Sequence, residues 1–156
     1  MSHHPNPFHL DFEEILPLFS VAPSENTVFE GPAPVPFPDA TPVPVTSIRI
    51  DQQWGVRFKW ETQGNLNWLM AGTWELTVYL ERMGGGEFNL PGGTKNIAFV
   101  SAPNTYTEDL TFPAGSVPEG AYRIVTTVTM KGPSGFRGPI GAIGDGPVIQ
   151  FYKVGL

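Results

Sequence analysis

The histidines are the first residues to consider, because an imidazole can bind a metal or move a proton at neutral pH. His3, His4 and His9 lie within the first nine residues, and the other residues of the 156-residue chain include no histidine. A Ser–His–acid triad would therefore need the start of the chain, and the sequence has neither a G-x-S-x-G motif nor a cysteine nucleophile. We interpret the three histidines as a solvated end, with adventitious metal binding as the alternative.

Paired carboxylates are the second kind of catalytic group, because glycoside hydrolysis needs two of them about 5–10 Å apart. Glu75 and Glu81 lie six residues apart on one expected strand, or about 20 Å at 3.3 Å per residue. The adjacent Glu108 and Asp109 should point to opposite faces. No spacing suggests a calcium loop, and Gly84–Gly86 lacks the lysine and helix of a phosphate loop. We therefore predict no catalytic residue, no metal site, no cofactor and no enzymatic activity.

Four tryptophans, at positions 54, 60, 68 and 74, could form the stacking platform of a carbohydrate-binding module. Trp54, Trp60 and Trp74 fall in the apolar register of alternating segments, so we expect them in a core. Trp68, in the segment GNLNWLMAG, falls in an expected loop. It could bind a ligand or plug one end of the domain, and the plug is the favoured reading.

The composition indicates what kind of fold must position these residues. Charged residues make up 15% of the chain, below the roughly 25% usual for soluble domains. The 18 glycines and 17 prolines are typical of an all-β domain with many turns. No apolar run approaches the roughly 18 residues of a membrane span, and no signal peptide is evident, so we expect a cytoplasmic protein that does not bind membranes. The absence of cysteine excludes disulfides.

The chain divides by composition into two unlike parts, residues 1–44 and 45–156. The first part holds 10 of the 17 prolines, six acidic residues and no lysine or arginine, so it carries the whole net charge of −6. This acidic balance disfavours a nucleic-acid partner. We predict that residues 1–44 form an extended arm, because proline at every second position from 32 to 38 cannot belong to a central strand.

Within the arm, the spacing of apolar residues predicts a short amphipathic helix over about residues 7–16. Asn6 would cap it and Pro7 would take the first helical position. A helix of about ten residues is marginal alone, so its apolar stripe should dock on its own domain or on a neighbour. The stripe and its continuation comprise Phe8, Phe12, Ile15, Leu16 and Phe19.

The second part alternates between apolar and polar residues, which predicts β-strands. The segment 54–60 places Trp54, Val56, Phe58 and Trp60 on one face, and the segments 74–82 and 121–131 alternate in the same way. Shorter candidates are 46–50, 96–100, 105–112 and 148–154. About seven short strands in this length are typical of a two-sheet antiparallel sandwich.

One segment carries a resemblance to a known superfamily. Residues 109–130, DLTFPAGSVPEGAYRIVTTVTM, resemble the E-strand, turn and F-strand of immunoglobulin-like and fibronectin-like domains. Gly120-Ala121-Tyr122 resembles the tyrosine corner, in which the hydroxyl bonds to an upstream backbone group. Pro118 and Ile124 depart from the immunoglobulin pattern, which often has aspartate and cysteine there. The resemblance implies the sandwich fold and no particular activity.

A run of glycines at every third position, GPSGFRGPIGAIGDGP over residues 132–147, imitates a collagen repeat. Five triplets with few prolines are too little for a triple helix, so we expect a long loop between the last two strands. Its apolar residues would make it a contact loop, with Phe136, Arg137 and Ile140 as the contacting side chains.

Two functional hypotheses remain open from the sequence. The first is a non-enzymatic structural module whose arm and glycine-rich loop dock on copies of itself or on other subunits of a larger tail-, capsid- or filament-like assembly. The second is a ligand-binding module, most simply for carbohydrate, that uses Trp68 and the neighbouring loops. Both place protein or ligand contacts, rather than catalysis, at the centre of the protein's role.

Overall fold

The computed structural model describes residues 5–13 and 16–155, and these residues form an all-β fold with one short 3-10 helix. The described elements are β1 (Phe8–Glu13), β2 (Ser20–Val21), β3 (Ser24–Glu30), β4 (Ser47–Arg49), β5 (Trp54–Gln63), η1 (Asn65–Leu69), β6 (Thr73–Arg82), β7 (Gly86–Phe88), β8 (Thr94–Ala98), β9 (Asn104–Phe112), β10 (Gly120–Lys131) and β11 (Arg137–Tyr152).

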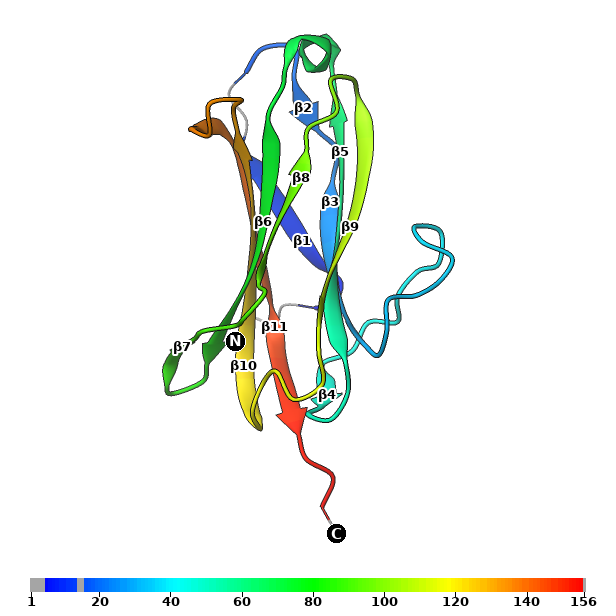
Figure 1. The fold of residues 1–156 in the computed structure, drawn as a ribbon, viewed down its shortest axis with the longest axis vertical. Helices are drawn as coiled ribbons and strands as arrows, with labels where there is room; N and C mark the ends of the chain where they lie inside the picture. The colour runs from blue at the N-terminus through cyan, green and yellow to red at the C-terminus, as the bar shows by residue number, and fades with distance from the viewer. Residues whose placement is uncertain (1–4, 14–15, 156) are drawn as a thin grey trace.

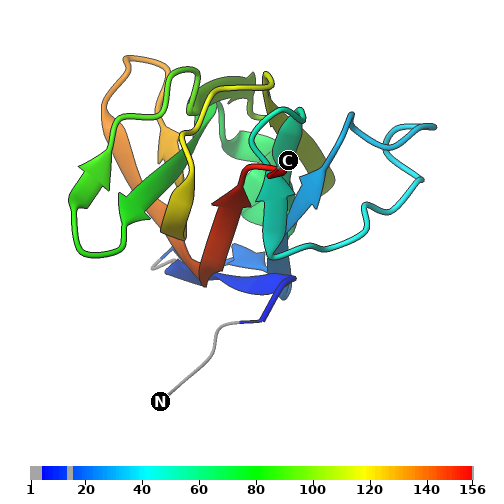
Figure 2. The same ribbon diagram turned by 90° about the horizontal axis from the view of Figure 1, so that it is seen from below.

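The strands form one hydrogen-bonded sheet that curls into two facing layers (Figures 1 and 2). One layer contains β3, β5 and β9, with the short β2 beside β5. The other contains β11, β10, β6 and β8, with β7 beside β6 and β4 beside β11. Strand β1 pairs with both β3 and β11 and so joins the layers. All described pairings are antiparallel except that of β4 with β11.

The core lies between the layers and is built largely from aromatic rings. Trp60 of β5 and Trp74 of β6 come from opposite layers and meet edge to face, with ring centroids 5.7 Å apart. Trp54 stacks on Phe112 at 4.5 Å, which closes the opposite end of the core. The predicted burial of three tryptophans is therefore confirmed, and the seven predicted strand positions all contain strands. The predicted total of seven strands is too low.

Residues Phe8–Glu13 form strand β1 and not the predicted amphipathic helix, of which residues 14 and 15 lie outside the described part of the chain. Phe8 and Leu10 point into the core from β1, while His9 and Asp11 point outward. Spacings of four residues are compatible with both a helix and a strand, and pairing on both edges of β1 decides for the strand. Strands β2 and β3 are also part of the sheet, so the described strands of this region belong to the sandwich and not to a separate arm.

The Pro-rich segment forms an excursion between β3 and β4. Residues 31–46 form no strand and project from the body of the sandwich, at the right of Figures 1 and 2. This agrees with the expectation that alternate prolines keep the segment out of a sheet. No helix in the described part of the chain has the length and apolar character needed to cross a membrane.

The glycine run is mostly strand, so the predicted long loop is wrong. Only residues 132–136 form a hairpin turn, and β11 begins at Arg137 and pairs with β10 on one side and β1 on the other. Gly144 shows why glycine is needed within the strand. A Cβ there would lie 2.3 Å from Thr126 Oγ1 and 2.7 Å from Asn26 Oδ1, inside the core.

The predicted tyrosine corner is present. The hydroxyl of the fully buried Tyr122 donates a hydrogen bond of 2.9 Å to the backbone oxygen of Pro118. Arg82 Nη2 donates to the same hydroxyl oxygen at 3.2 Å. This local feature supports the sandwich topology at the start of β10.

Candidate ligand-binding groove

A groove with a mixed polar and apolar lining crosses the outer face of the layer formed by β3, β5 and β9. It consists of two adjoining depressions of about 340 and about 270 Å³, which share Glu25, Lys59 and Thr105. The side chains that line it come from alternate positions on the three strands, because successive residues of a strand point to opposite faces. The Pro-rich excursion supplies one wall of the larger depression, and β1 supplies His9 to the smaller one.

The strand register places the groove residues in cross-strand rows. Lys59 of β5 lies between Glu25 of β3 and Thr107 of β9. The next outward row is Thr27, Arg57 and Asp109. Further lining residues are Pro38, Asp39, Thr41 and Pro42 in the larger depression, and Ala22, Pro23, Ser24, Trp60 and Glu61 in the smaller one.

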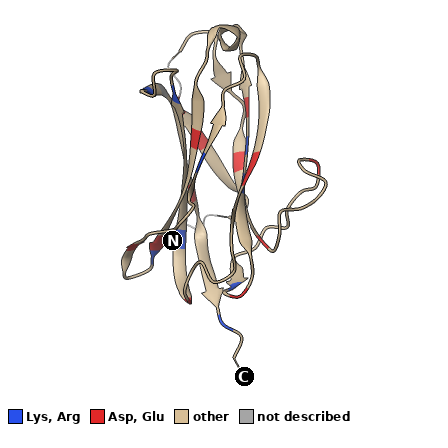
Figure 3. Ribbon diagram, viewed as in Figure 1, with Lys and Arg blue, Asp and Glu red and all other residues tan. Residues whose placement is uncertain are grey.

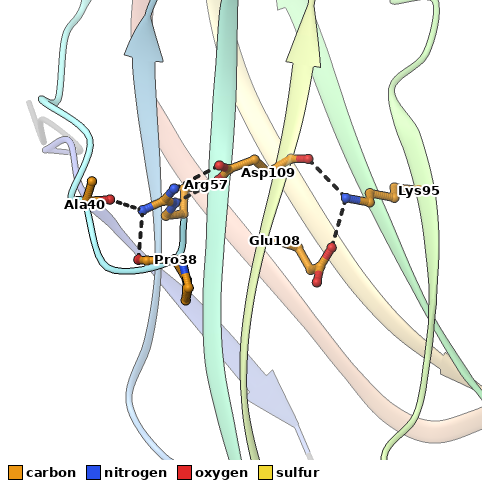
Figure 4. Close-up of polar contacts among 6 residues, drawn as sticks. All are labelled: Pro38, Ala40, Arg57, Lys95, Glu108 and Asp109. Carbon is orange, nitrogen blue, oxygen red and sulfur yellow. Dashed lines mark hydrogen bonds and ion pairs between the residues drawn. The ribbon is translucent and has the colours of Figure 1, made fainter. Parts of the chain in front are cut away.

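Arg57 connects the Pro-rich excursion, which forms one wall of the groove, to Asp109 of β9 (Figure 4). Its Nε and Nη2 donate to the two carboxylate oxygens of Asp109 at 2.8 and 2.9 Å, which is a bidentate pair. Its Nη1 donates to the backbone oxygens of Ala40 and Pro38 in the Pro-rich excursion. Both side chains of the pair are more than nine-tenths buried, and the guanidinium lies 5.4 Å from the centre of the Phe37 ring.

Lys95 closes the side of the sandwich next to the groove. Its Nζ lies 2.9 Å from Glu108 Oε1 and donates to the backbone oxygen of Asp109 at 3.3 Å. Lys95 belongs to β8 and both partners belong to β9, and the two strands are edges of opposite layers (Figure 4). The lysine therefore bridges the open side of the curled sheet and occupies a backbone acceptor of the β9 edge.

Lys59 is the cation that the fold leaves free in the groove. Within the part of the chain that the structure describes, its ammonium group makes neither an ion pair nor a hydrogen bond. Lys153, which lies beyond β11, shares this property, whereas the other lysines and arginines each contact a polar or acidic group. The groove thus presents an uncommitted ammonium between the side chains of Glu25 and Thr107.

The structure separates the interaction residues that the sequence suggested. Five of these candidates belong to the body of the protein. Three are buried in the core, namely Phe8, Phe19 and Ile140, and two are half-buried against it, namely Phe12 and Leu16. Ile15 lies outside the described residues. The described residues of the apolar stripe therefore pack within this chain.

The remaining three candidates, Trp68, Phe136 and Arg137, are exposed at one end of the sandwich and not in the groove. Trp68 has 62% of its surface exposed, so the interpretation of this residue as a plug is wrong. Phe136 occupies the tip of the β10–β11 hairpin and is 78% exposed.

Sequence reasoning missed the groove because half of it lies in the segment that was interpreted as an arm. The outward positions of β5, Arg57 and Lys59, were predicted correctly. Their neighbours Glu25 and Thr27 belong to β3, whose strand pattern SENTVFE contains only two large apolar residues. The signal that could have identified β3 is its alternation, in which Asn26 and Val28 alternate with Glu25 and Thr27.

Comparison with known proteins supports the fold and gives no family. The crystal structure of the C-terminal domain of wzt is similar, with a TM-score of 0.59 at 12% sequence identity, over 97% of this chain and 84% of that one. No family profile matches the chain, and no curated protein matches it either. The similarity supports a β-sandwich-like fold for this chain, which it shares with that domain.

Proposed function

We propose that this protein is a non-catalytic ligand-binding module that holds a carbohydrate chain in the groove across β3, β5 and β9. The observation that supports this most directly is the free Lys59 at the junction of the two depressions. A site whose central cation has no internal partner has kept its hydrogen-bonding capacity for a ligand. Three donors are available on such an ammonium group.

The mixture of groups in the groove suits sugar hydroxyls. A hydroxyl both donates and accepts, so neighbouring hydroxyls of one sugar can accept from Lys59 and donate to Glu25. Thr105 and Thr107 supply further groups that do both. The carboxylates of Glu25, Asp39 and Glu61 outnumber the single free ammonium, which disfavours phosphate-rich ligands such as nucleic acids.

The shape of the groove also favours an extended chain. Typical pockets for small molecules are enclosed and mainly apolar. This groove is instead open, its lining mixes polar and apolar side chains, and its depressions adjoin along β5. The outward positions from Arg57 to Glu61 cover about 13 Å at 3.3 Å per residue, enough for more than one sugar ring.

The test is binding of the full chain to an array of immobilised oligosaccharides, followed by calorimetry with the best glycan. We expect Lys59→Ala and Glu25→Ala to weaken binding about tenfold or more, since each removes hydrogen bonds to the ligand. Lys153→Ala is the matched control, because it removes the other free lysine at a place outside the groove. It should bind as the unmodified protein does.

Two results would contradict the proposal. One is the absence of binding to any glycan by the unmodified protein. The other is binding that survives both groove substitutions and is lost in Trp68→Ala, which would move the site to the exposed loops. The assembly hypothesis keeps one specific observation in its favour, the exposed Trp68 and Phe136 at the end of the sandwich.

A further inference from the structure

Four loops meet at the end of the sandwich that lies opposite the C-terminus (Figure 1). They comprise residues 16–19, 64–72, 99–103 and 132–136, and we call them the charge-free end. Leu66 N donates to Leu18 O at 3.0 Å, and Ser101 Oγ donates to Met70 O at 2.6 Å. The fourth loop begins directly after Lys131. Lys131 pairs with Thr73, which directly follows the second loop, so the second and fourth loops are adjacent.

The charge-free end contains no lysine, arginine, aspartate or glutamate. In Figure 3 the loops at the top of the view carry neither red nor blue segments, whereas blue segments flank the β10–β11 hairpin, because Lys131 and Arg137 lie directly before and after residues 132–136. Several large apolar side chains of these loops are exposed to solvent. They are Leu18 (72% exposed), Trp68 (62%), Leu69 (84%), Val100 (44%) and Phe136 (78%).

The loops hold these side chains outward in a defined conformation. The buried Asn67 donates from Nδ2 to the backbone oxygens of Gln63 at 2.9 Å and Gly64 at 2.8 Å, which closes the η1 turn beneath Trp68. The hairpin that carries Phe136 is closed by Gly132 N donating to Phe136 O at 2.8 Å. Ordered apolar groups lose little further freedom when they are covered, which favours association.

We propose that the charge-free end binds the same end of a second copy of this chain, which gives a two-fold dimer. Each copy carries a net charge of −6, so two copies repel one another at long range. The charge-free end is a surface where two copies meet without placing like charges in contact. An uncharged apolar patch is also complementary to itself, as a two-fold interface requires.

The exposed residues of the patch include two large aromatic side chains, Trp68 and Phe136. Each aromatic side chain can bury about 150–250 Å², a substantial share of the about 800 Å² that each partner buries in a standard interface. Exposed Arg137 lies at the edge of the patch, beside Phe136. Tryptophan and arginine are the residues that most often dominate such contacts.

The test is sedimentation velocity of the full chain over a range from low micromolar to near-millimolar concentration. We expect a concentration-dependent dimer, and a dissociation constant about tenfold weaker or more in the double variant Trp68→Ala, Leu69→Ser. The matched control is Val35→Ser with Val43→Ser, which removes two equally exposed apolar side chains from the Pro-rich excursion. The control should dimerise as the unmodified chain does.

Fluorescence gives a second readout, because Trp68 is exposed while the other three tryptophans are at most 1% exposed. Dimer formation should shift the emission to shorter wavelength. A chain that stays monomeric throughout the range would overturn the proposal, as would a dimer that keeps its affinity in the double variant. A monomer that instead binds phosphatidylcholine vesicles through Trp68 would assign the end to lipid.

Discussion

At the scale of single residues, the Arg57–Asp109 pair is the polar contact on which the groove most depends. Arg57 lies in β5, yet two of its partners belong to the excursion between β3 and β4. A charge that is this far buried is tolerated only when it is paired. The pair therefore orders the wall, while the free Lys59 two residues along the same strand is left for the ligand.

We predict that Arg57→Ala lowers the free energy of unfolding by about 3–5 kcal/mol, because it leaves the carboxylate of Asp109 buried without a partner. Replacing both members, Arg57→Met with Asp109→Leu, should recover much of this loss. Urea unfolding followed by circular dichroism measures both effects.

The control for this prediction is the half-exposed pair of Arg123 and Asp145, whose side chains are 40% and 42% exposed. Arg123→Ala should cost about 1 kcal/mol or less, since solvent screens both charges. If the two arginine substitutions cost the same, burial does not give the Arg57 pair its importance.

At the scale of elements, β11 shows how glycine spacing can conceal a strand. Its glycines are not equally required by the packing. A Cβ on Gly144 would overlap Thr126 and Asn26, whereas a Cβ on Gly141 would lie 3.7 Å from Val128 O, an ordinary contact distance. A triple helix would instead need every third glycine equally. The two positions therefore separate the strand from the collagen-like interpretation.

We predict that Gly144→Ala destabilises the protein by about 1–3 kcal/mol through overpacking. Gly141→Ala should be neutral or stabilising by up to about 1 kcal/mol, because alanine restricts the unfolded chain and fits the strand. Thermal unfolding of the two single variants measures the difference. Equal losses in both would contradict the role that the strand gives to Gly144.

The strands that could be predicted from the sequence are those in which apolar and polar residues alternate along one continuous segment. Strands β5, β6 and β10 alternate over many residues, and the corner at Tyr122 has a local motif, so local reasoning sufficed for them. Strand β1 could not be predicted in this way, because Phe8 and Phe12 fit either period. Its two pairing partners are β3 and the distant β11, since Leu10 pairs with Gly144.

The groove depended on the same non-local pairing. The polar residues of β5 were expected to face outward, but a floor exists only because β3 and β9 lie on both sides of β5. Once residues 1–44 were assigned to an arm, Glu25 and Lys59 could not be placed together. Residue type and local sequence alone predict that Trp68 and Phe136 lie in loops, and the structure shows that both are exposed.

At the scale of the whole molecule, strands β1 and β3 are structural parts of the sandwich. Strands β1 and β3 lie between β5 and β11 in the order of the sheet, so they connect the two layers. They also contribute buried apolar residues, including Phe8, Leu10, Val28 and Phe29. This differs from an arm, which could be removed and leave a folded domain behind.

We predict that a chain shortened by its first 44 residues does not fold cooperatively. The loss of β1 and β3 exposes core surface on both layers, and replacing even one buried phenylalanine by alanine costs about 3–5 kcal/mol. Near-ultraviolet circular dichroism and the thermal unfolding curve measure the outcome. A shortened chain with native-like spectra and a sharp transition would contradict it, and would restore the two-part organisation of the chain.

The control removes only the excursion and keeps both strands. Replacing residues 32–41 with a short Gly-Ser linker should leave the chain folded, since loop length has a small effect on stability. It should still lower the melting temperature, because Arg57 loses the backbone oxygens of Pro38 and Ala40. The wall of the groove would be lost with it, so glycan binding should weaken while the sandwich persists. A variant that binds glycans with unchanged affinity would show that the ligand contacts the strands alone.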